Sequence, residues 1–268
     1  MAFALGPKAR AADVGLNIFD ETGSTNIDAM AHARAGGPAP SWFVTTMQTA
    51  GRGRRNRVWT APRGNLASSV LEILDVTPLV AATLGFAAGL ALEAALRQVS
   101  REAAVRAPDS AANDYRLKWP NDVLAGRAKI SGILLEAETL TSQRLAVVVG
   151  MGTNVVAAPQ DTPYPATSLA ALGVQASAED LFAALSDAWL TYRGIWDDGR
   201  GFADIRQAWL ARAAGLGEPV SVALGNQTIS GIFDTIDATG CMIVATADRR
   251  RIPIAAGDVH FGSAASAR

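Results

Sequence analysis

Two short lysine-led segments carry the residue types in this chain that are best suited to chemistry. Residues 118–122 read Lys-Trp-Pro-Asn-Asp, and eleven residues after the first lysine the segment 129–136 reads Lys-Ile-Ser-Gly-Ile-Leu-Leu-Glu. Because proline fixes φ and Asn-Asp favours turns, the first segment is expected to end a strand and present an amide and a carboxylate. Asn121 then suits an adenine or sugar contact, Asp122 suits Mg²⁺, and the Lys129 ammonium suits a phosphate or carboxylate. Together the segments predict half of a site for an anionic substrate.

The other half is predicted upstream, in residues 50–59, which read Ala-Gly-Arg-Gly-Arg-Arg-Asn-Arg-Val-Trp. Four arginines within six residues cannot pack in a core, and the glycines let the backbone approach a ligand closely. Taken alone, a run of this kind is more often a solvated basic loop. The Gly-x-Gly pair follows an expected strand at 42–48, but the third position of a dinucleotide fingerprint is Asn56 and no helix is expected to open there. A Rossmann loop is therefore disfavoured, and the sequence contains no P-loop motif.

Five segments of the chain occur in an order that matches a known enzyme family. They are Ser-Thr-Asn at 24–26, Gly-Arg-Gly-Arg-Arg at 51–55, the two lysine-led segments, and Gly-Met-Gly-Thr-Asn-Val at 150–155. In this order and spacing they resemble the motif series of the biotin protein ligases, and the resemblance runs from about residue 19 to the C-terminus. It implies that biotin and MgATP form biotinyl-5′-adenylate. It also implies that biotin then passes to a lysine of the biotin carboxyl carrier domain of a biotin-dependent carboxylase.

The resemblance assigns a set of biotin-binding residues. On sequence alone, Ser24 is expected to cap a helix, since serine favours that position. In biotin protein ligases the segment matching 24–26 instead binds the ureido head of biotin, and the residue matching Gln48 adds a further contact to it. The arginine loop and the second lysine-led segment are expected to hold the biotin carboxylate. The implied biotin-binding residues are Ser24, Thr25, Asn26, Gln48, Arg52, Gly53, Arg54, Lys129 and Gly132.

Lys129 and Arg54 are the expected catalytic residues. Attack of a carboxylate on phosphorus brings two anions together, so neutralisation of charge is the main catalytic need. The guanidinium fork of arginine suits phosphate oxygens, and Trp59 is expected either to stack on adenine or to anchor the loop. The residues implied for ATP and the adenylate are Arg54, Trp59, Asn121, Lys129 and Asn154, with Asp122 as the Mg²⁺ ligand.

Three positions near these motifs receive no role in the ligand site. Arg55 and Arg57 are read as solvated charges of the loop. Asn56 stands where the family usually has glycine, which leaves the mobility of the loop open. The family often has a serine and an arginine just after the valine found here at 259, and this chain has neither. No ligand contact is therefore assigned to the segment 256–261.

Composition limits the other classes of protein to which the chain can belong. It has 268 residues, 49% hydrophobic and 18% charged, and a net charge of −1, which favours a globular protein without general attraction for nucleic acid. One cysteine, Cys241, excludes an intramolecular disulfide, and two histidines argue against a zinc centre. The uncharged stretch 76–92 is expected to be a helix buried against a sheet rather than a membrane span. No secretory signal is recognised, so a cytoplasmic protein without a membrane partner is predicted.

The pattern of elements predicts an α+β fold with two parts. Residues 1–215 are expected to form a catalytic biotin- and ATP-binding domain, with a mixed, mostly antiparallel sheet and helices packed on one face. From residue 216 to 268, short alternating strands separated by turns indicate a small domain that must dock on the first. Family resemblance implies that this second domain is an SH3-like β-barrel. The expected helices include 78–100, 177–192 and 202–212, and the expected strands include 66–74, 115–119, 130–137 and 144–150.

Three rival interpretations stay open at this level. A lipoate-protein ligase has a related fold and the same adenylation chemistry, although the arginine loop and Lys-Trp-Pro-Asn-Asp favour biotin. Some biotin ligases are also transcription repressors with a winged helix ahead of the Ser-Thr-Asn segment, but only about twenty residues precede it here, so no DNA binding is expected. A catalytically silent biotin-binding protein is disfavoured because Lys129 and both glycine motifs are intact. The sequence leaves monomer and homodimer open, and the resemblance is compatible with a dimer through the edge of the main sheet.

Overall fold

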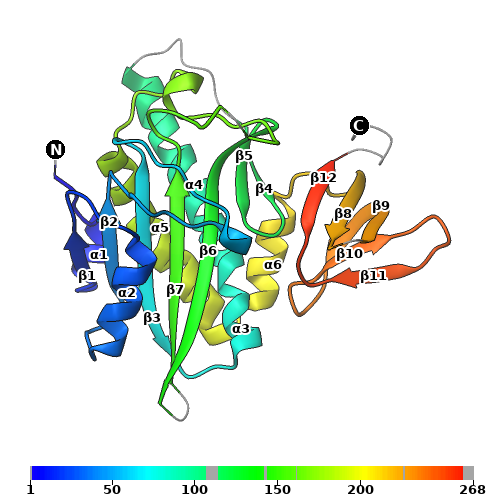
Figure 1. The fold of residues 1–268 in the computed structure, drawn as a ribbon, viewed down its shortest axis with the longest axis horizontal. Helices are drawn as coiled ribbons and strands as arrows, with labels where there is room; N and C mark the ends of the chain where they lie inside the picture. Colours follow the sequence, from blue (N-terminus) through cyan, green and yellow to red (C-terminus); the bar gives the residue numbers. More distant parts are fainter. Residues whose placement is uncertain (1, 107–113, 142–143, 161, 226, 262–268) are drawn as a thin grey trace.

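The structure is a computed structural model that describes residues 2–106, 114–141, 144–160, 162–225 and 227–261. It contains a seven-stranded sheet flanked by helices and a five-stranded sheet near the C-terminus (Figure 1). The α-helices of the described chain are α1 (Pro7–Ala11), α2 (Thr25–Arg34), α3 (Pro78–Ala82), α4 (Leu84–Arg106), α5 (Ala178–Trp196) and α6 (Phe202–Leu210), with short 3-10 turns at Arg54–Asn56, Ala170–Leu172 and Asp197–Gly199.

The seven-stranded sheet has the order β1-β2-β3-β7-β6-β5-β4. Strands β1 and β2 pair in parallel, and each of the other neighbouring pairs is antiparallel. The predicted mixed, mostly antiparallel sheet is therefore confirmed. The strands are β1 (Gly15–Ile18), β2 (Ser41–Thr45), β3 (Leu66–Leu74), β4 (Tyr115–Lys118), β5 (Asp122–Ala125), β6 (Ala128–Thr141) and β7 (Arg144–Thr153).

Helices cover both faces of the central strands. The long helices α4 and α5 pack on one face, as predicted, against side chains such as Val147 and Val149 of β7. Helix α2 lies on the opposite face, where Met30 packs with Leu71 of β3 and Val148 of β7 (Figure 1). The sequence predicted helices on one face only, so the position of α2 on the opposite face was not predicted. Strands β3 and β7 are buried almost throughout, so their sequences lack the alternation that would mark a single covered face.

The uncharged helix of the sequence is a core element. The segment predicted as one helix over 78–100 forms two helices, α3 and α4, which meet at Thr83. Helix α4 continues beyond the predicted end at residue 100 to Arg106, because residues 101–106 include strong helix formers. Within the stretch Pro78–Val105, the most apolar 18-residue window has a mean hydropathy of 1.9, so the helix could cross a membrane by length and composition, yet 72% of that window is buried inside the protein. This agrees with the predicted helix packed on a sheet.

The C-terminal strands form an antiparallel sheet of order β11-β10-β9-β8-β12 that docks on the main part of the molecule. Trp119 donates its indole N–H to the carbonyl of Gly240, and Arg206 donates to the carbonyl of Ile236. Within the described residues no pairing of β11 with β12 closes the sheet, so the barrel remains a prediction. The strands are β8 (Pro219–Leu224), β9 (Gln227–Ile236), β10 (Met242–Ala245), β11 (Arg251–Ile254) and β12 (Asp258–Phe261).

Candidate active site

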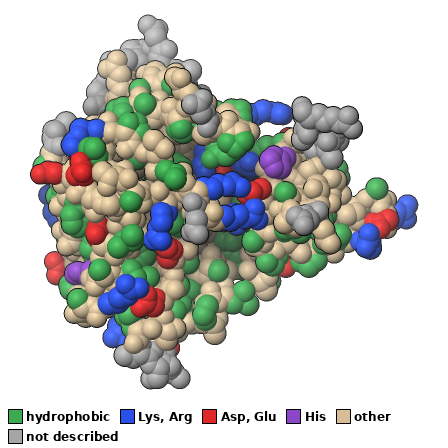
Figure 2. Space-filling view, viewed as in Figure 1, with side chains coloured by type: hydrophobic (Ala, Val, Ile, Leu, Met, Phe, Trp, Pro, Cys, Tyr) green, Lys and Arg blue, Asp and Glu red, His purple; other side chains and the backbone are tan. Residues whose placement is uncertain are grey.

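A pocket of about 820 Å³, counting the space at its open mouth, lies on the same face of the main sheet as α2. Figure 2 shows Lys and Arg side chains gathered around the hollow near the centre of this face. All but one of the site residues predicted from the sequence line this pocket, which confirms that the motifs converge: Ser24, Thr25, Asn26, Gln48, Arg52, Gly53, Arg54, Trp59, Asn121, Asp122, Lys129 and Gly132.

Three glycines of β6 and β7 form the floor of the pocket. Gly132 pairs with Gly152 across the two strands, and Gly150 lies two residues before Gly152 on the same face. A Cβ on Gly152 would come within 2.5 Å of the Trp59 ring, and one on Gly150 would come within 2.2 Å of the Asn26 amide oxygen. The absence of side chains at these positions therefore gives Trp59 and Asn26 their places in the pocket.

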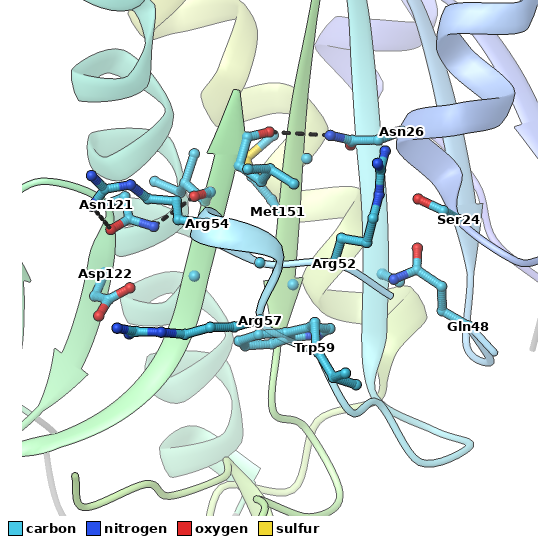
Figure 3. A pocket seen from close by; sticks show the side chains of 18 of the residues that line it. Ser24, Asn26, Gln48, Arg52, Arg54, Arg57, Trp59, Asn121, Asp122 and Met151 are labelled. Carbon is cyan, nitrogen blue, oxygen red and sulfur yellow. Dashed lines mark hydrogen bonds between the residues drawn. The ribbon is translucent and has the colours of Figure 1, made fainter. Parts of the chain in front are cut away.

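The pocket has two chemically different ends. In Figure 3, Ser24, Asn26 and Gln48 lie at one end, and Asn121 and Asp122 lie at the other. The arginine loop, which runs from Gly51 to Trp59, passes between the two ends. Apart from Arg52, the groups at one end are thus neutral and polar, and the other charged groups gather toward the opposite end.

Lys129 is the central cation of the charged end. Its ammonium lies 2.6 Å from a carboxylate oxygen of Asp122, and both side chains are largely buried. It also lies 5.5 Å from the ring centre of Trp59 and 5.4 Å from that of Tyr164. Tyr164 also lines the pocket and was missed from the sequence, because it belongs to a proline-rich loop that reaches the site through pairing of Lys129 with Ala166. The ammonium is held by one carboxylate and two aromatic faces.

Arg54 is held over the same end by Asn121. Arg54 donates from Nη1 to the Asn121 amide oxygen at 3.2 Å, and the Asn121 amide in turn donates to the carbonyl of Ile133 at 2.7 Å. Burial lowers the pKa of the Arg54 guanidinium, and the charge of neighbouring Arg55 lowers it further. Arg54 is therefore a partly desolvated cation beside a neutral partner, and an anionic ligand would stabilise its charge.

Arg52 has an acidic partner in β6, and its predicted contact with biotin stays a prediction. It was predicted near the biotin carboxylate, and it does line the pocket, but its guanidinium pairs with Glu136 of β6 at 3.2 Å. In Figure 3 it extends toward Asn26. Arg52 therefore lies nearer the neutral end than Arg54.

The neutral end is organised around Thr25 and Gln48. Gln48 accepts a hydrogen bond from the backbone N–H of Thr25 at 3.0 Å, and its Nε2 lies over Gly51. Ser24 occupies the N-cap of α2 as predicted, but its hydroxyl makes no capping hydrogen bond and lines the pocket. Simple capping therefore does not account for Ser24.

The C-terminal sheet contributes to the pocket, although no ligand contact is assigned to the segment 256–261 from the sequence. Asp258 of β12 lines the pocket and accepts hydrogen bonds from Arg55 at 2.7 Å and Arg57 at 2.5 Å. Burial alone would raise the pKa of Asp258, but the hydrogen bond from Arg57 and the charges of both arginines outweigh it, so this pKa lies below its usual value. Arg55 and Arg57, read as solvated charges, thus tie the arginine loop to the C-terminal sheet.

Asn154 is the predicted site residue that does not line the pocket. Its side chain is buried, and its amide donates to the carbonyl of Thr167 at 3.0 Å. The amide oxygen has no hydrogen-bond partner among the described residues. Its predicted contact with adenine stays a prediction, and its visible role is to hold the segment that follows β7.

Comparison with known proteins agrees with the motif order. Residues 24–154 match the model of the biotin/lipoate A/B protein ligase family, and residues 215–262 match that of the biotin protein ligase C-terminal domain. The chain is 38% identical to the biotin–[acetyl-CoA-carboxylase] ligase of Paracoccus denitrificans, over 91% of this chain and 100% of that protein. It is 35% identical to the ligase of the same name from Mycobacterium tuberculosis, over 91% of this chain and 88% of that protein.

The fold agrees with solved structures. The structure of biotin protein ligase from Aquifex aeolicus in complex with biotin and ATP superimposes with a TM-score of 0.73 at 23% identity, covering 92% of this chain and 99% of that one. At this identity the likeness concerns the fold, while the two relatives above establish the family. This chain belongs to the biotin protein ligases of the biotin/lipoate A/B protein ligase family.

Proposed function

We propose that the protein activates biotin with MgATP to biotinyl-5′-AMP and transfers biotin to a lysine of a biotin carboxyl carrier domain. The observation that carries this proposal is the convergence of a neutral polar end and a charged end in one pocket. Biotin has the matching polarity, because a neutral cyclic urea and a carboxylate lie at opposite ends of the molecule. ATP supplies the second anion at the charged end.

The neutral end is proposed to bind the urea. Ser24, Thr25 and Gln48 offer hydroxyl and amide groups there, and Thr25 is nearly fully buried. A urea in such a site exchanges its hydrogen bonds with water for bonds to fixed protein groups. A site of this kind discriminates strongly against ligands that lack those groups, because its buried polar atoms are then left unpaired.

The charged end is proposed to carry out adenylation. A carboxylate oxygen of biotin attacks the α-phosphorus of ATP, the new oxygen–phosphorus bond forms, and pyrophosphate leaves with the oxygen that joined the α- and β-phosphates. Lys129 is proposed to leave Asp122 for the carboxylate and the α-phosphate, and Arg54 to contact the phosphate. Both cations offset the negative charge that gathers at phosphorus. In the second step the lysine amine of the carrier attacks the acyl carbon, and AMP leaves.

Asp122 is the proposed ligand for Mg²⁺. Magnesium that accompanies a nucleotide is usually bound by one or two carboxylates together with phosphate oxygens and water. Asp122 fits this pattern, since it lies on the pocket wall next to Lys129. Among the described residues no group of three or more acidic, histidine or cysteine side chains forms a complete metal cage. Bound there, Mg²⁺ would supply further positive charge to the phosphates.

Further residues are proposed to hold the adenylate. The Trp59 ring covers Gly152 and its indole N–H has no partner within the described residues, so it can stack on or donate to a ligand. Asn121 is proposed to contact the ribose and phosphate while it positions Arg54, and Asn154 to reach the adenine edge. Gly53 and Gly132 are proposed to let the ligand approach the backbone.

The proposed division places the catalytic domain in residues 1–215 and the C-terminal domain in 216–268. The proposed partner is the carrier domain of acetyl-CoA carboxylase or a similar carboxylase, in line with the names of the two relatives. The net charge of −1 supports a protein that does not bind nucleic acid, and a gel shift with biotin and ATP tests this. A cytoplasmic location and a homodimer through the edge of the main sheet stay predictions, and light scattering tests the latter.

Mass spectrometry of the reaction tests the proposed function. Purified protein incubated with biotin and MgATP is expected to yield biotinyl-5′-AMP, and an added carrier domain should gain the mass of one biotinyl group. Lipoate supplied in place of biotin provides the comparison with the rival activity. A rise in melting temperature and an adenylate with lipoate, but not with biotin, would overturn the proposal.

A further inference from the structure

A row of hydrogen-bonded side chains connects the neutral end of the pocket to an acidic residue outside it. We call it the polar chain, and its members in order are Glu136, Asn26, Ser69, Thr25 and Gln48. Asn26 donates to Glu136 at 2.7 Å, and Ser69 donates to the Asn26 amide oxygen at 2.6 Å. The hydroxyls of Ser69 and Thr25 are 2.7 Å apart, and the Thr25 hydroxyl also lies 3.2 Å from the Gln48 amide oxygen, to which it can donate instead. Glu136 does not line the pocket, so its influence on a ligand must pass through neighbouring residues, either this chain or Arg52.

The register of the sheet brings the members of the chain together. Ser69 of β3 and Leu134 of β6 both pair with Gly150 of β7, so the three residues form a row across the sheet. Asn26 lies over Gly150 and bonds to both neighbours, since its amide also donates to the Leu134 carbonyl at 3.3 Å. Glu136 follows Leu134 by two residues and therefore projects from the same face.

The two ends of the polar chain fix the direction of every proton within it. An ionised carboxylate can only accept, so Asn26 must turn its NH₂ toward Glu136 and its oxygen toward Ser69. The single hydroxyl proton of Ser69 is then used on Asn26. The contact between the two hydroxyls consequently requires Thr25 to donate to Ser69.

Gln48 is oriented independently at the other end. The backbone N–H of Thr25 can only donate, so the Gln48 oxygen must face it at 3.0 Å and the Gln48 NH₂ is turned away. The Thr25 hydroxyl has one proton and two acceptors within reach, Ser69 at 2.7 Å and the Gln48 oxygen at 3.2 Å. Because Ser69 donates to Asn26, the shorter contact takes the Thr25 proton, and Thr25 retains lone pairs as acceptors. The pocket therefore receives an acceptor from Thr25 and a donor from Gln48, side by side.

We propose that Glu136 is a positioning residue that makes Thr25 an acceptor beside the independently oriented Gln48 donor and thereby selects a cyclic urea. A urea presents an N–H next to a carbonyl oxygen, which is the complement of an acceptor next to a donor. The inference rests on the proposed function, because it concerns recognition of the biotin head. Without a carboxylate at 136, Asn26 is held in its orientation only by the longer contact to Leu134, and its amide can turn over. The hydroxyls would then reverse: Ser69 would donate to Thr25, and the Thr25 proton would be free to turn to the Gln48 oxygen or toward the urea N–H, so Thr25 would no longer be fixed as an acceptor.

Glu136 also pairs with Arg52 of the arginine loop at 3.2 Å, which gives a competing explanation. In that case Glu136 would act by anchoring the loop through its charge. The two explanations differ in what glutamine at 136 should do. Glutamine retains an oxygen that can accept from Asn26 but loses the charge that attracts Arg52.

The test measures binding of biotin and of ATP, each alone, by calorimetry on four full-length proteins: wild type, Glu136→Ala, Glu136→Gln and Glu138→Ala. Glu138 is the matched control, since it lies two residues further along β6, pairs with Arg34 at 2.5 Å and is not part of the chain. Glu136→Ala is expected to weaken biotin by about 10- to 100-fold, as loss of a hydrogen bond to a charged group implies, with ATP binding unchanged. Glu136→Gln should lose less than about fivefold in affinity for biotin, and Glu138→Ala should bind biotin as tightly as wild type does.

A second test exchanges the amide at position 26 and the carboxylate at position 136. Asn26→Asp places two carboxylates against each other and should weaken biotin, whereas Asn26→Asp combined with Glu136→Gln restores a donor–acceptor pair and should recover part of the affinity. Equal losses in Glu136→Gln and Glu136→Ala, or no recovery in the double variant, would overturn the inference. If wild-type protein binds no biotin, the proposed function itself fails. Normal biotin binding by Glu136→Ala contradicts only the role of Glu136.

Discussion

Asp258 accepts a 2.5 Å hydrogen bond from Arg57, although 201 residues separate the two in the chain. The same carboxylate oxygen also accepts from Arg55, so the arginine loop is tied to β12 at two points. A Gly-rich loop with several arginines would otherwise be free to move. The C-terminal sheet therefore holds the loop over the pocket when no anion is bound there.

Replacing Asp258 with alanine is expected to release the arginine loop. Trypsin cleaves after arginine, so limited proteolysis of the ligand-free variant should cut within residues 52–57 several-fold faster than in wild type. Asp248→Ala is the matched control, because Asp248 pairs with Arg250 in a turn of the same sheet, away from the pocket. Equal cleavage of all three proteins would show that Asp258 does not restrain the loop.

The pH dependence of this contact follows from the lowered pKa of Asp258. A carboxyl group whose pKa is lower in the folded state stabilises the fold above its unfolded pKa of about 3.9, and this contribution is lost as the pH falls through the lower folded value. The difference in unfolding free energy between wild type and Asp258→Ala should therefore be constant from about pH 5 to 8 and shrink below about pH 4. Because Arg55 and Arg57 are partly exposed, screening by solvent limits this difference in unfolding free energy to about 1 kcal/mol. Urea denaturation at several pH values measures this difference.

Asp258 is an example of a site residue that could not be predicted from the sequence. The motif residues of the pocket could be predicted because each group is contiguous, as with the segments around Asn121 and Lys129. Asp258, Tyr164 and Ser69 come from segments with no motif of their own, and only the packing of distant elements brings them to the site. Strands β3 and β7 are buried on both faces, so their sequences do not alternate and do not indicate which face α2 covers.

Loss of the Lys129 ammonium is expected to abolish most adenylate formation. Lys129→Ala should lower the rate of biotinyl-5′-AMP formation by about 10²- to 10³-fold, the usual cost of removing one positioned group at a developing anion. The rate of pyrophosphate release measures this step. Because Lys129→Ala leaves the largely buried Asp122 carboxylate without its ion-pair partner, the melting temperature is expected to fall, and circular dichroism checks that the variant is folded. A variant with near-normal turnover would exclude Lys129 from catalysis.

Two glycine substitutions should separate the binding of the two substrates. Gly150→Ala places a methyl group 2.2 Å from the Asn26 amide oxygen, whereas Gly152→Ala places one 2.5 Å from the Trp59 ring. Overpacking of this kind costs about 1–3 kcal/mol. We expect Gly150→Ala to weaken biotin by about tenfold or more and Gly152→Ala to weaken ATP by a similar factor, as measured by calorimetry. If both variants weakened the same ligand, the assignment of the two ends would be incorrect.

Trp59 provides a fluorescence signal for closure of the pocket. The other five tryptophans are buried, at 0–2% exposure, and Trp59 is partly exposed. Iodide should therefore quench mainly Trp59 in the ligand-free protein, and biotin with ATP should reduce that quenching because the ring becomes covered. In Trp59→Phe the quenchable component should be absent. Unchanged quenching of wild type with both ligands would contradict contact between Trp59 and the adenylate.

The last prediction concerns retention of the adenylate by Arg54. Biotinyl-5′-AMP is a reactive mixed anhydride, so it must be held away from water until a carrier domain docks. Arg54 is partly desolvated and has only the neutral oxygen of Asn121 as its hydrogen-bond partner among the described residues, so a phosphate should draw it in and order the loop. Arg54→Gly is expected to form the adenylate but to release it at least tenfold faster and to label lysines of an unrelated protein. Arg63→Gly is the matched control, since Arg63 is exposed, lies outside the pocket and pairs with Glu21 at 4.0 Å. Adenylate dissociation and biotin incorporation into the bystander are the two measurements. If Arg54→Gly retained the adenylate as long as wild type and labelled only the carrier, Arg54 would have no role in closing the loop.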